Sequence, residues 1–143
     1  MLVLDTNVIS EILRPKPDAG IEAWLDSLSP ASVFTTAISQ AEIMYGIAIM
    51  PKGQRQSDLL TAAALTFAED FGGRVLPFDS EAAKIYAVIA SARRTAGQPL
   101  SQADAQIAAI TQSRGGRLAT RNIRDFANCG IDIVSPWDAQ VKP

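Results

Sequence analysis

Short apolar segments alternate with helical patterns along this chain, and this alternation constrains the fold more than any other feature. Residues 1–4 are apolar at every position before Asp5, as expected of a strand that is buried on both faces. Further strands are predicted at residues 32–36, 74–78, 117–120 and 131–135. Strands that alternate with helices form a parallel sheet with helices on both of its faces.

Helices are indicated between these strands by apolar residues three and four positions apart, and by Pro or Gly where the pattern stops. Asn7 is the expected N-cap of the first helix. The chain of 143 residues shows no internal repeat or linker, so one α/β domain over residues 1–143 is expected. The predicted helices span residues 8–13, 18–28, 38–50, 54–71, 79–96 and 101–114.

The residue types that are missing limit the chemistry. The sequence has no histidine and a single cysteine, Cys129, which excludes Ser-His-Asp and Cys-His catalysis, zinc centres and disulfide scaffolds. The net charge of −2 indicates no overall basic field for nucleic acid. Residues 1–5 lack the basic start of a signal peptide, and no apolar run approaches the roughly 18 residues of a membrane span. A cytoplasmic protein that does not enter a membrane is therefore expected.

Three acidic residues stand at positions where burial is expected. Asp5 follows the first strand, at the edge where ligands of open α/β sheets bind, and Glu42 and Asp104 share helix faces with apolar neighbours. Each also has a structural explanation, which is a turn aspartate at Asp5 and two capping boxes, from Ser39 to Glu42 and from Ser101 to Asp104. Because a buried unpaired carboxylate is costly, the functional alternative is a hard divalent cation, Mg²⁺, Mn²⁺ or Ca²⁺.

A polar segment follows the fourth predicted strand. Thr120, Arg121, Asn122 and Asp125 stand at the carboxyl end of that strand, and they lie near Asp5 if the first and fourth strands are neighbours. Taken alone, the segment is most simply explained as a polar loop with an asparagine turn.

Together, four segments resemble a PIN domain, and within that family the VapC-type toxin ribonucleases of toxin–antitoxin pairs. They are Leu-Asp-Thr-Asn at 4–7, Ala-Glu at 41–42, Ala-Asp-Ala-Gln-Ile-Ala-Ala at 103–109 and Ala-Thr-Arg-Asn-Ile-Arg-Asp-Phe at 119–126. Three further segments are similar to the FitB subgroup, namely Leu-Arg-Pro-Lys-Pro at 13–17, Trp-Leu-Asp-Ser-Leu at 24–28 and Leu-Pro-Phe-Asp at 76–79. The segments follow the order of the family over almost the whole chain.

The resemblance implies a three-layer αβα sandwich with about five parallel strands in the order 3-2-1-4-5. It implies a Mg²⁺- or Mn²⁺-dependent endoribonuclease, usually a homodimer held by a small VapB-like antitoxin. The acidic positions of the family correspond to Asp5, Glu42 and Asp104. A fourth acid is expected after the fourth strand, where this chain has Asn122, with Asp125 three residues later.

These positions suggest a division of roles. Asp5 and Asp104 are the predicted direct metal ligands, and Glu42 is predicted to hold a coordinated water or a second ion. Asn122 or Asp125 would orient the remaining water. The hydroxyl groups suited to hydrogen bonds behind these ligands are those of Thr6 and Thr120.

RNA has to approach an acidic pocket on an acidic protein, so cations are needed around that pocket. Trp24, Tyr45 and Ile49 are candidates for the contact surface of a homodimer, because aromatic residues are enriched in interface cores. The candidates for contacts to RNA phosphates are Arg14, Lys16, Arg93, Arg94, Arg121 and Arg124.

Three other functions fit parts of the pattern. A phosphoacceptor receiver-like module needs an acidic pair after the first strand and a late lysine, for which this chain offers only Lys142. A carboxylate-metal nuclease that acts on DNA would share the site, although the chain is short for elements that clamp a duplex. A catalytically silent PIN interaction module is compatible with the neutral residue Asn122.

Overall fold

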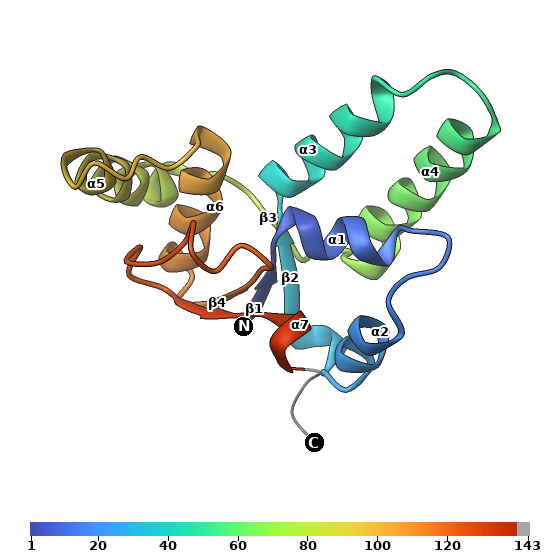
Figure 1. Cartoon of the computed structure of the whole chain (residues 1–143), viewed down its shortest axis with the longest axis horizontal. Coiled ribbons are helices and arrows are strands. Elements are labelled where there is room, and N and C mark those ends of the chain that lie inside the picture. The colour runs from blue at the N-terminus through green and yellow to red at the C-terminus, as the bar shows by residue number, and fades with distance from the viewer. Residues whose placement is uncertain (140–143) are drawn as a thin grey trace.

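The computed structural model describes residues 1–139, so Lys142 lies outside the described residues. Its centre is one parallel sheet in the strand order β3-β2-β1-β4-β5, which confirms the predicted order (Figure 1). Each strand lies within its predicted range. The strands are β1 (Leu2–Leu4), β2 (Val33–Thr36), β3 (Val75–Leu76), β4 (Arg117–Ala119) and β5 (Asp132–Val134).

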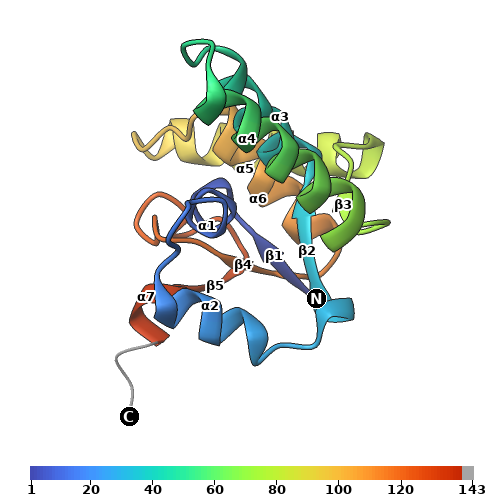
Figure 2. The same cartoon turned by 90° about the vertical axis from the view of Figure 1, so that its right-hand side faces the viewer.

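Helices cover both faces of this sheet (Figures 1 and 2). The predicted helix over residues 54–71 continues beyond α4 as a π-helical turn, η2 (Thr66–Asp70). Two short elements are not predicted by the sequence pattern, the 3-10 turn η1 (Pro30–Ser32) and α7 (Pro136–Ala139). No helix within residues 1–139 is long and apolar enough to cross a membrane. The other helices are α1 (Thr6–Ile12), α2 (Ala19–Asp26), α3 (Ala37–Ala48), α4 (Gln54–Leu65), α5 (Ser80–Thr95) and α6 (Gln102–Ser113).

The central strand β1 divides the core into two apolar clusters, because successive side chains of a strand point to opposite faces. Val3 packs with Ile107 of α6 in one cluster, and Leu4 packs with Val8 of α1 and Ile43 of α3 in the other. Full burial of a side chain such as Leu4 contributes about 1.5–3 kcal/mol. The three-layer αβα architecture is therefore confirmed.

Helix α1 begins two residues earlier than predicted, and its N-cap is Asp5 rather than Asn7. The Thr6 backbone N–H donates to Asp5 Oδ1 over 2.8 Å. The prediction for Asn7 is wrong because only one residue, Asp5, separates β1 from α1, and that residue takes the N-cap position. The Asn7 amide instead donates to Asp5 Oδ2 and Thr120 Oγ1, each over 3.3 Å.

The two predicted capping boxes have different outcomes. Helix α3 begins at Ala37 with Thr36 as its N-cap, so the box from Ser39 to Glu42 does not form. Helix α6 begins after Ser101, whose hydroxyl oxygen accepts the Asp104 backbone N–H over 3.1 Å. Glu42 is therefore left without a capping role, whereas Asp104 lies in the first turn of its helix.

Candidate active site

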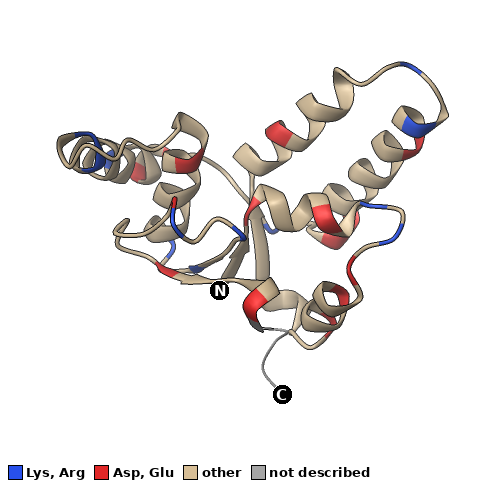
Figure 3. Cartoon of the chain, in the orientation of Figure 1, with Lys and Arg blue, Asp and Glu red and all other residues tan. Residues whose placement is uncertain are grey.

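A pocket of about 510 Å³ opens at the carboxyl edge of the sheet, beside the ends of β1 and β4. It exists because β1 and β4 are neighbours, which brings segments more than a hundred residues apart in sequence to one edge. Figure 3 shows acidic positions on α1, α3 and α6 around this central region. The lining residues are Asp5, Thr6, Asn7, Ser10, Glu11, Arg14, Glu42, Asp104, Arg121 and Asn122.

Asp5 is the most buried acid of the pocket, with only 3% of its surface exposed. Its Oδ2 accepts a hydrogen bond from the Thr120 hydroxyl over 2.7 Å. The pKa of Asp5 is raised to about 6, chiefly by burial of the carboxyl group. The hydrogen bonds from Thr120 and Thr6 oppose this increase, and repulsion from Asp104 and Glu42 adds a smaller part of it. At neutral pH the Asp5 carboxyl group is ionised, and its burial in this form lowers the free energy of unfolding.

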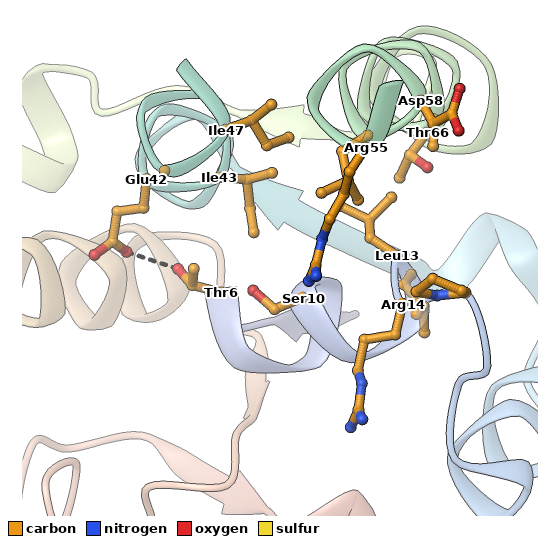
Figure 4. A pocket seen from close by; sticks show the side chains of 15 residues that line it. Thr6, Ser10, Leu13, Arg14, Glu42, Ile43, Ile47, Arg55, Asp58 and Thr66 are labelled. Carbon is orange, nitrogen blue, oxygen red and sulfur yellow. Dashed lines mark hydrogen bonds between the residues drawn. The ribbon is translucent and has the colours of Figure 1, made fainter. Parts of the chain in front are cut away.

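Glu42 projects from the middle of α3 towards the start of α1 (Figure 4). The Thr6 hydroxyl donates to Glu42 Oε1 over 2.6 Å, and its oxygen lies 3.0 Å from Ser39 Oγ. Thr6 therefore supports two carboxylates. Its backbone N–H donates to Asp5, and its hydroxyl donates to Glu42 and orients it.

Asp104 reaches the same pocket from the first turn of α6. Partial burial raises the pKa of Asp104, and repulsion from Glu42 and Asp125 adds to the increase, whereas the Ser101 hydroxyl lowers it. Asp104 thus stands in the first turn that Ser101 caps, and its own side chain faces other carboxylates.

Asn122 and Asp125 share one turn after β4. The Asp125 backbone N–H donates to the Asn122 carbonyl oxygen over 3.1 Å, as expected of a single helical turn. Asn122 lines the pocket, whereas Asp125 is exposed and lies outside the lining. Asp125 is nevertheless close enough to Asp104 to raise the pKa of that carboxyl group by repulsion.

Thr120 connects these parts beneath the pocket floor. Its fully buried hydroxyl donates to Asp5 Oδ2 and accepts from the Asn7 amide. The same oxygen accepts the Asn122 backbone N–H over 3.0 Å. One hydroxyl therefore fixes the positions of Asp5, Asn7 and Asn122 relative to one another.

The predicted RNA-contacting cations differ in their surroundings. Arg121 lines the pocket, and its guanidinium lies 4.0 Å from the centre of the Trp137 ring. Arg93 is buried and donates only inward, so its prediction as a contact to phosphate is wrong. The remaining candidates are all exposed, and of these only Arg14 lines the pocket; they are Arg14, Lys16, Arg94 and Arg124.

Glu11 is a pocket residue that the sequence analysis misses. It is only 6% exposed, and its carboxylate accepts the Asp18 backbone N–H over 3.1 Å and pairs with Arg14 over 3.4 Å. The sequence carries a signal for it, because Glu11 shares a helical stripe with Val8 and Ile12 in the same way as Glu42 shares one with Ile38.

The donor set of the pocket fits a hard divalent cation. Its charged acceptors are carboxylates, which are the ligands that Mg²⁺ and Mn²⁺ prefer. Within residues 1–139, no three carboxylate or thiolate side chains stand close enough to form a complete cage of protein ligands. Such an open arrangement suits Mg²⁺, which keeps several waters and takes one or two carboxylates.

A larger groove of about 930 Å³ adjoins the pocket between α1, α3 and α4 (Figure 4). Its floor is apolar, with Leu13 and Ile43 among its residues, and Arg55 reaches across it from α4 towards Ser10. The groove and the pocket are continuous because they share four lining residues. These are Thr6, Ser10, Arg14 and Glu42.

The sheet order, together with acids from three helices at its carboxyl edge, defines a class of protein. The profile of the PIN domain family matches residues 2–131, and the chain belongs to this family. The resemblance predicted from the sequence is confirmed, and the receiver-like alternative is excluded.

Individual members of the family are similar to this chain over nearly its full length. VapC ribonuclease Y4jK of Sinorhizobium fredii is 38% identical over 138 residues, which cover 96% of this chain and 99% of that protein. Toxin FitB of Neisseria gonorrhoeae is 39% identical over 137 residues, with the same coverage of both chains. The solved structure of FitAB bound to the IR36 DNA fragment is similar with a TM-score of 0.88, at 39% identity and 96% coverage of each chain.

Proposed function

We propose that this chain is a metal-dependent endoribonuclease, the toxin of a type II toxin–antitoxin pair, which acts in the cytoplasm as a single PIN domain. The observation that carries the proposal is that Asp5, Glu42 and Asp104 all line one pocket, with no buried basic partner in its lining. Membership of the PIN family and full-length similarity to proteins named VapC ribonuclease and toxin FitB support it.

The residues of the pocket suit phosphodiester hydrolysis with Mg²⁺ or Mn²⁺. Such a cation supplies, when bound, an activated water, neutralisation of the phosphate and stabilisation of the leaving oxygen. Asp5 and Asp104 would hold it, while Thr120 orients Asp5 and Thr6 orients Glu42. Glu42 and the turn from Asn122 to Asp125 present acceptors that can fix the attacking water and take its proton.

The cations at the rim would meet the neighbouring phosphates of RNA. Arg121 is held against Trp137, which limits the side-chain freedom that binding would otherwise remove. Arg14 also lines the pocket, where it is paired with Glu11. Neither residue is arranged to read a base, so these contacts favour binding to phosphate rather than to a sequence.

The proposal is tested by incubation of the purified protein with an RNA and with a DNA of the same sequence, in Mg²⁺ or Mn²⁺ and in chelator. We expect cleavage of the RNA alone, and only with the cation. Cleavage of the DNA would favour the DNA nuclease, and binding of RNA without cleavage in either cation would favour the silent interaction module.

A small antitoxin is the proposed protein partner, and the groove between α1, α3 and α4 is where we place one of its segments. The apolar floor with charged residues at the rim fits an amphipathic segment, and its end would reach Glu42. The similarity to the two-component FitAB structure supports a partner of this kind. Arg55→Glu, at an exposed residue of the groove, is expected to abolish co-purification with the product of the neighbouring small gene.

The relative contributions of Asn122 and Asp125 can be separated by mutation. We expect Asp125→Ala to lower RNA cleavage more than Asn122→Ala, because only a carboxylate adds negative charge near Asp104. Metal affinity should fall modestly in both variants, since Asp5 and Asp104 remain. Single-turnover cleavage rates and calorimetric Mn²⁺ titrations measure the two effects, and the opposite ranking would assign the fourth position to Asn122.

A homodimer is expected to use the exposed face of α3. Tyr45 and Ile49 are 68% and 66% exposed, whereas Trp24 is partly buried against the apolar core. We expect Tyr45→Glu to convert a dimer into a monomer at micromolar concentration, as measured by light scattering. Leu65→Glu is the control, since Leu65 is exposed on α4. A wild-type chain that is monomeric at that concentration would contradict the prediction.

A further inference from the structure

Arg93 stands in the last turn of α5, where a cation is favoured by the helix dipole, but its guanidinium is turned into the protein. The residue is 8% exposed, whereas its neighbour Arg94 is exposed. A buried arginine next to an exposed one indicates a specific structural task, because burial of a charge is costly unless its donors are satisfied.

The guanidinium of Arg93 donates to two segments that are distant in sequence. Its Nε donates to the Gln98 carbonyl oxygen over 2.7 Å, in the connection between α5 and α6. Its Nη1 donates to the Asp125 and Ala127 carbonyl oxygens over 3.0 and 2.8 Å, and lies 3.3 Å from Cys129 Sγ. The first segment leads into the helix of Asp104, and the second carries Asp125 itself.

Carbonyl groups, rather than a carboxylate, therefore balance this charge. None of the ion pairs found within the described part of the chain involves Arg93. If the loop after β4 moved away, a buried guanidinium would lose most of its acceptors, so the loop conformation and the position of Arg93 are coupled. The loop contains no strand or helix and turns through Asn128, which has a φ of 61°. Its side-chain anchors are Phe126 and Cys129, which are buried in the core, and Arg93 adds hydrogen bonds to its backbone.

We propose that Arg93 is a positioning residue for the active site, which fixes the turn from Asn122 to Asp125 relative to the connection that leads into α6. The geometry that carries this inference is one guanidinium that holds the backbone of Asp125 on one side and the approach to α6 on the other. A lysine cannot replace it, because a single ammonium group does not present the two directions of Nε and Nη1. The positioning role of Arg93 in catalysis rests on the proposed ribonuclease function. Its hydrogen bonding to the loop after β4 is independent of that function.

The loop support is tested first, without RNA or metal. Hydrogen exchange of the backbone amides is compared in the wild type, Arg93→Lys and the control Lys84→Gln, which removes an exposed charge from the same helix. We expect faster exchange in Arg93→Lys over residues 121–130, with the sheet still protected. Unchanged exchange in this segment, or an equal increase throughout the chain, would overturn the proposal.

The effect on the active site is tested by a double-mutant cycle with Asp125→Ala. Arg93→Lys alone is expected to lower kcat for RNA about 10- to 100-fold with little change in KM, as for other residues that orient catalytic groups. In the Asp125→Ala background the further loss should be less than about threefold, because Arg93 acts through Asp125. Losses that multiply independently would show a general role in stability and would overturn the positioning role.

The two tests separate this inference from the proposed function. If the wild type cleaves no RNA, the proposed function fails, while the hydrogen-exchange result still decides whether Arg93 holds the loop. If the wild type cleaves RNA and the cycle shows no coupling, the ribonuclease assignment stands and the role of Arg93 does not.

Discussion

Asp5→Asn is expected to lower kcat for RNA cleavage by about 10³-fold, which corresponds to about 4 kcal/mol of transition-state stabilisation. Asp5 is the most buried acid of the pocket and the one on which the hydrogen bonds from Thr120, Thr6 and Asn7 converge. An amide has one acceptor oxygen and no charge, so it is a much weaker ligand for a divalent cation. Single-turnover cleavage in Mn²⁺ measures the loss.

The matched control for this variant is Asp26→Asn, because Asp26 is an exposed aspartate on α2 far from the pocket lining. It loses the same charge and should keep the wild-type rate. Wild-type cleavage by purified Asp5→Asn would remove Asp5 from the active site and leave its burial without a functional explanation.

The same substitution is expected to stabilise the folded protein when no divalent cation is present. The pKa of Asp5 is raised from 3.8 to about 6 on folding, so the folded state binds the proton more tightly than the unfolded state does. The free energy of unfolding therefore falls as the pH rises from about 4 through 6, by at most about 3 kcal/mol. Above that range Asp5 is ionised in both states, so the free energy of unfolding stays at this lower value.

Urea unfolding in chelator at pH 4.5 and pH 7.5 measures the effect. At pH 7.5, Asp5→Asn should be more stable than the wild type by about 1–2 kcal/mol, since the amide avoids the charge but loses part of the hydrogen bonding. At pH 4.5 the difference should largely disappear. Addition of Mn²⁺ should raise the melting temperature of the wild type alone, because only the folded wild type binds it tightly. A wild type that becomes more stable relative to the variant above pH 6 would refute this explanation.

Thr120→Val is expected to lower RNA cleavage about 10- to 100-fold and the free energy of unfolding by about 1–3 kcal/mol. Valine has nearly the shape of threonine, so the change removes one hydroxyl from a fully buried position. Asp5 loses its shortest hydrogen bond, and the Asn7 amide and the Asn122 backbone N–H each lose an acceptor. The catalytic loss follows because these groups can then shift relative to Asp104.

Two controls separate this positioning effect from a loss of stability. Thr120→Ser keeps the hydroxyl and should retain most of the activity. Thr111→Val removes another fully buried hydroxyl, which donates to the Ile107 carbonyl oxygen over 2.8 Å within α6. It should lower stability but leave the cleavage rate unchanged. Equal catalytic losses in Thr111→Val and Thr120→Val would mean that Thr120 has no special relation to the active site.

The strands and most helices of this protein are predictable from sequence because they rest on local patterns. The apolar run at residues 1–4 requires burial on both faces, and only a central strand offers it. Ser101 caps α6 as expected, since the interaction joins residues three apart. Asn7 is misassigned because the sequence does not show that a single residue connects β1 to α1, which makes that residue, Asp5, the cap.

The acids of the site are also visible in the sequence, because a carboxylate on an apolar stripe conflicts with its surroundings. Asp104 is recognised in this way, and Glu11 carries the same signal on a helix of only seven residues, where it was missed. Glu42 is found from the same pattern, but its expected burial is wrong, because it is exposed together with its helical neighbours Tyr45 and Ile49.

Arg93 carries a similar signal, because it stands four residues after Ile89 and seven after Tyr86 on the buried stripe of its helix. Arg94 follows Ala90 and is exposed, so the two arginines are not equivalent as contacts to RNA and should not be grouped together.

The sequence by itself thus determined the fold class, the acidic character of the site and its place at the ends of strands. Only the tertiary structure decided which groups act on one another. Thr120 meets Asp5 across 115 positions, and Arg93 meets Asp125 across 32. Contacts of this range depend on the pairing of β1 with β4 and on the docking of α5 and α6, and these result from packing of the whole core rather than from any local pattern.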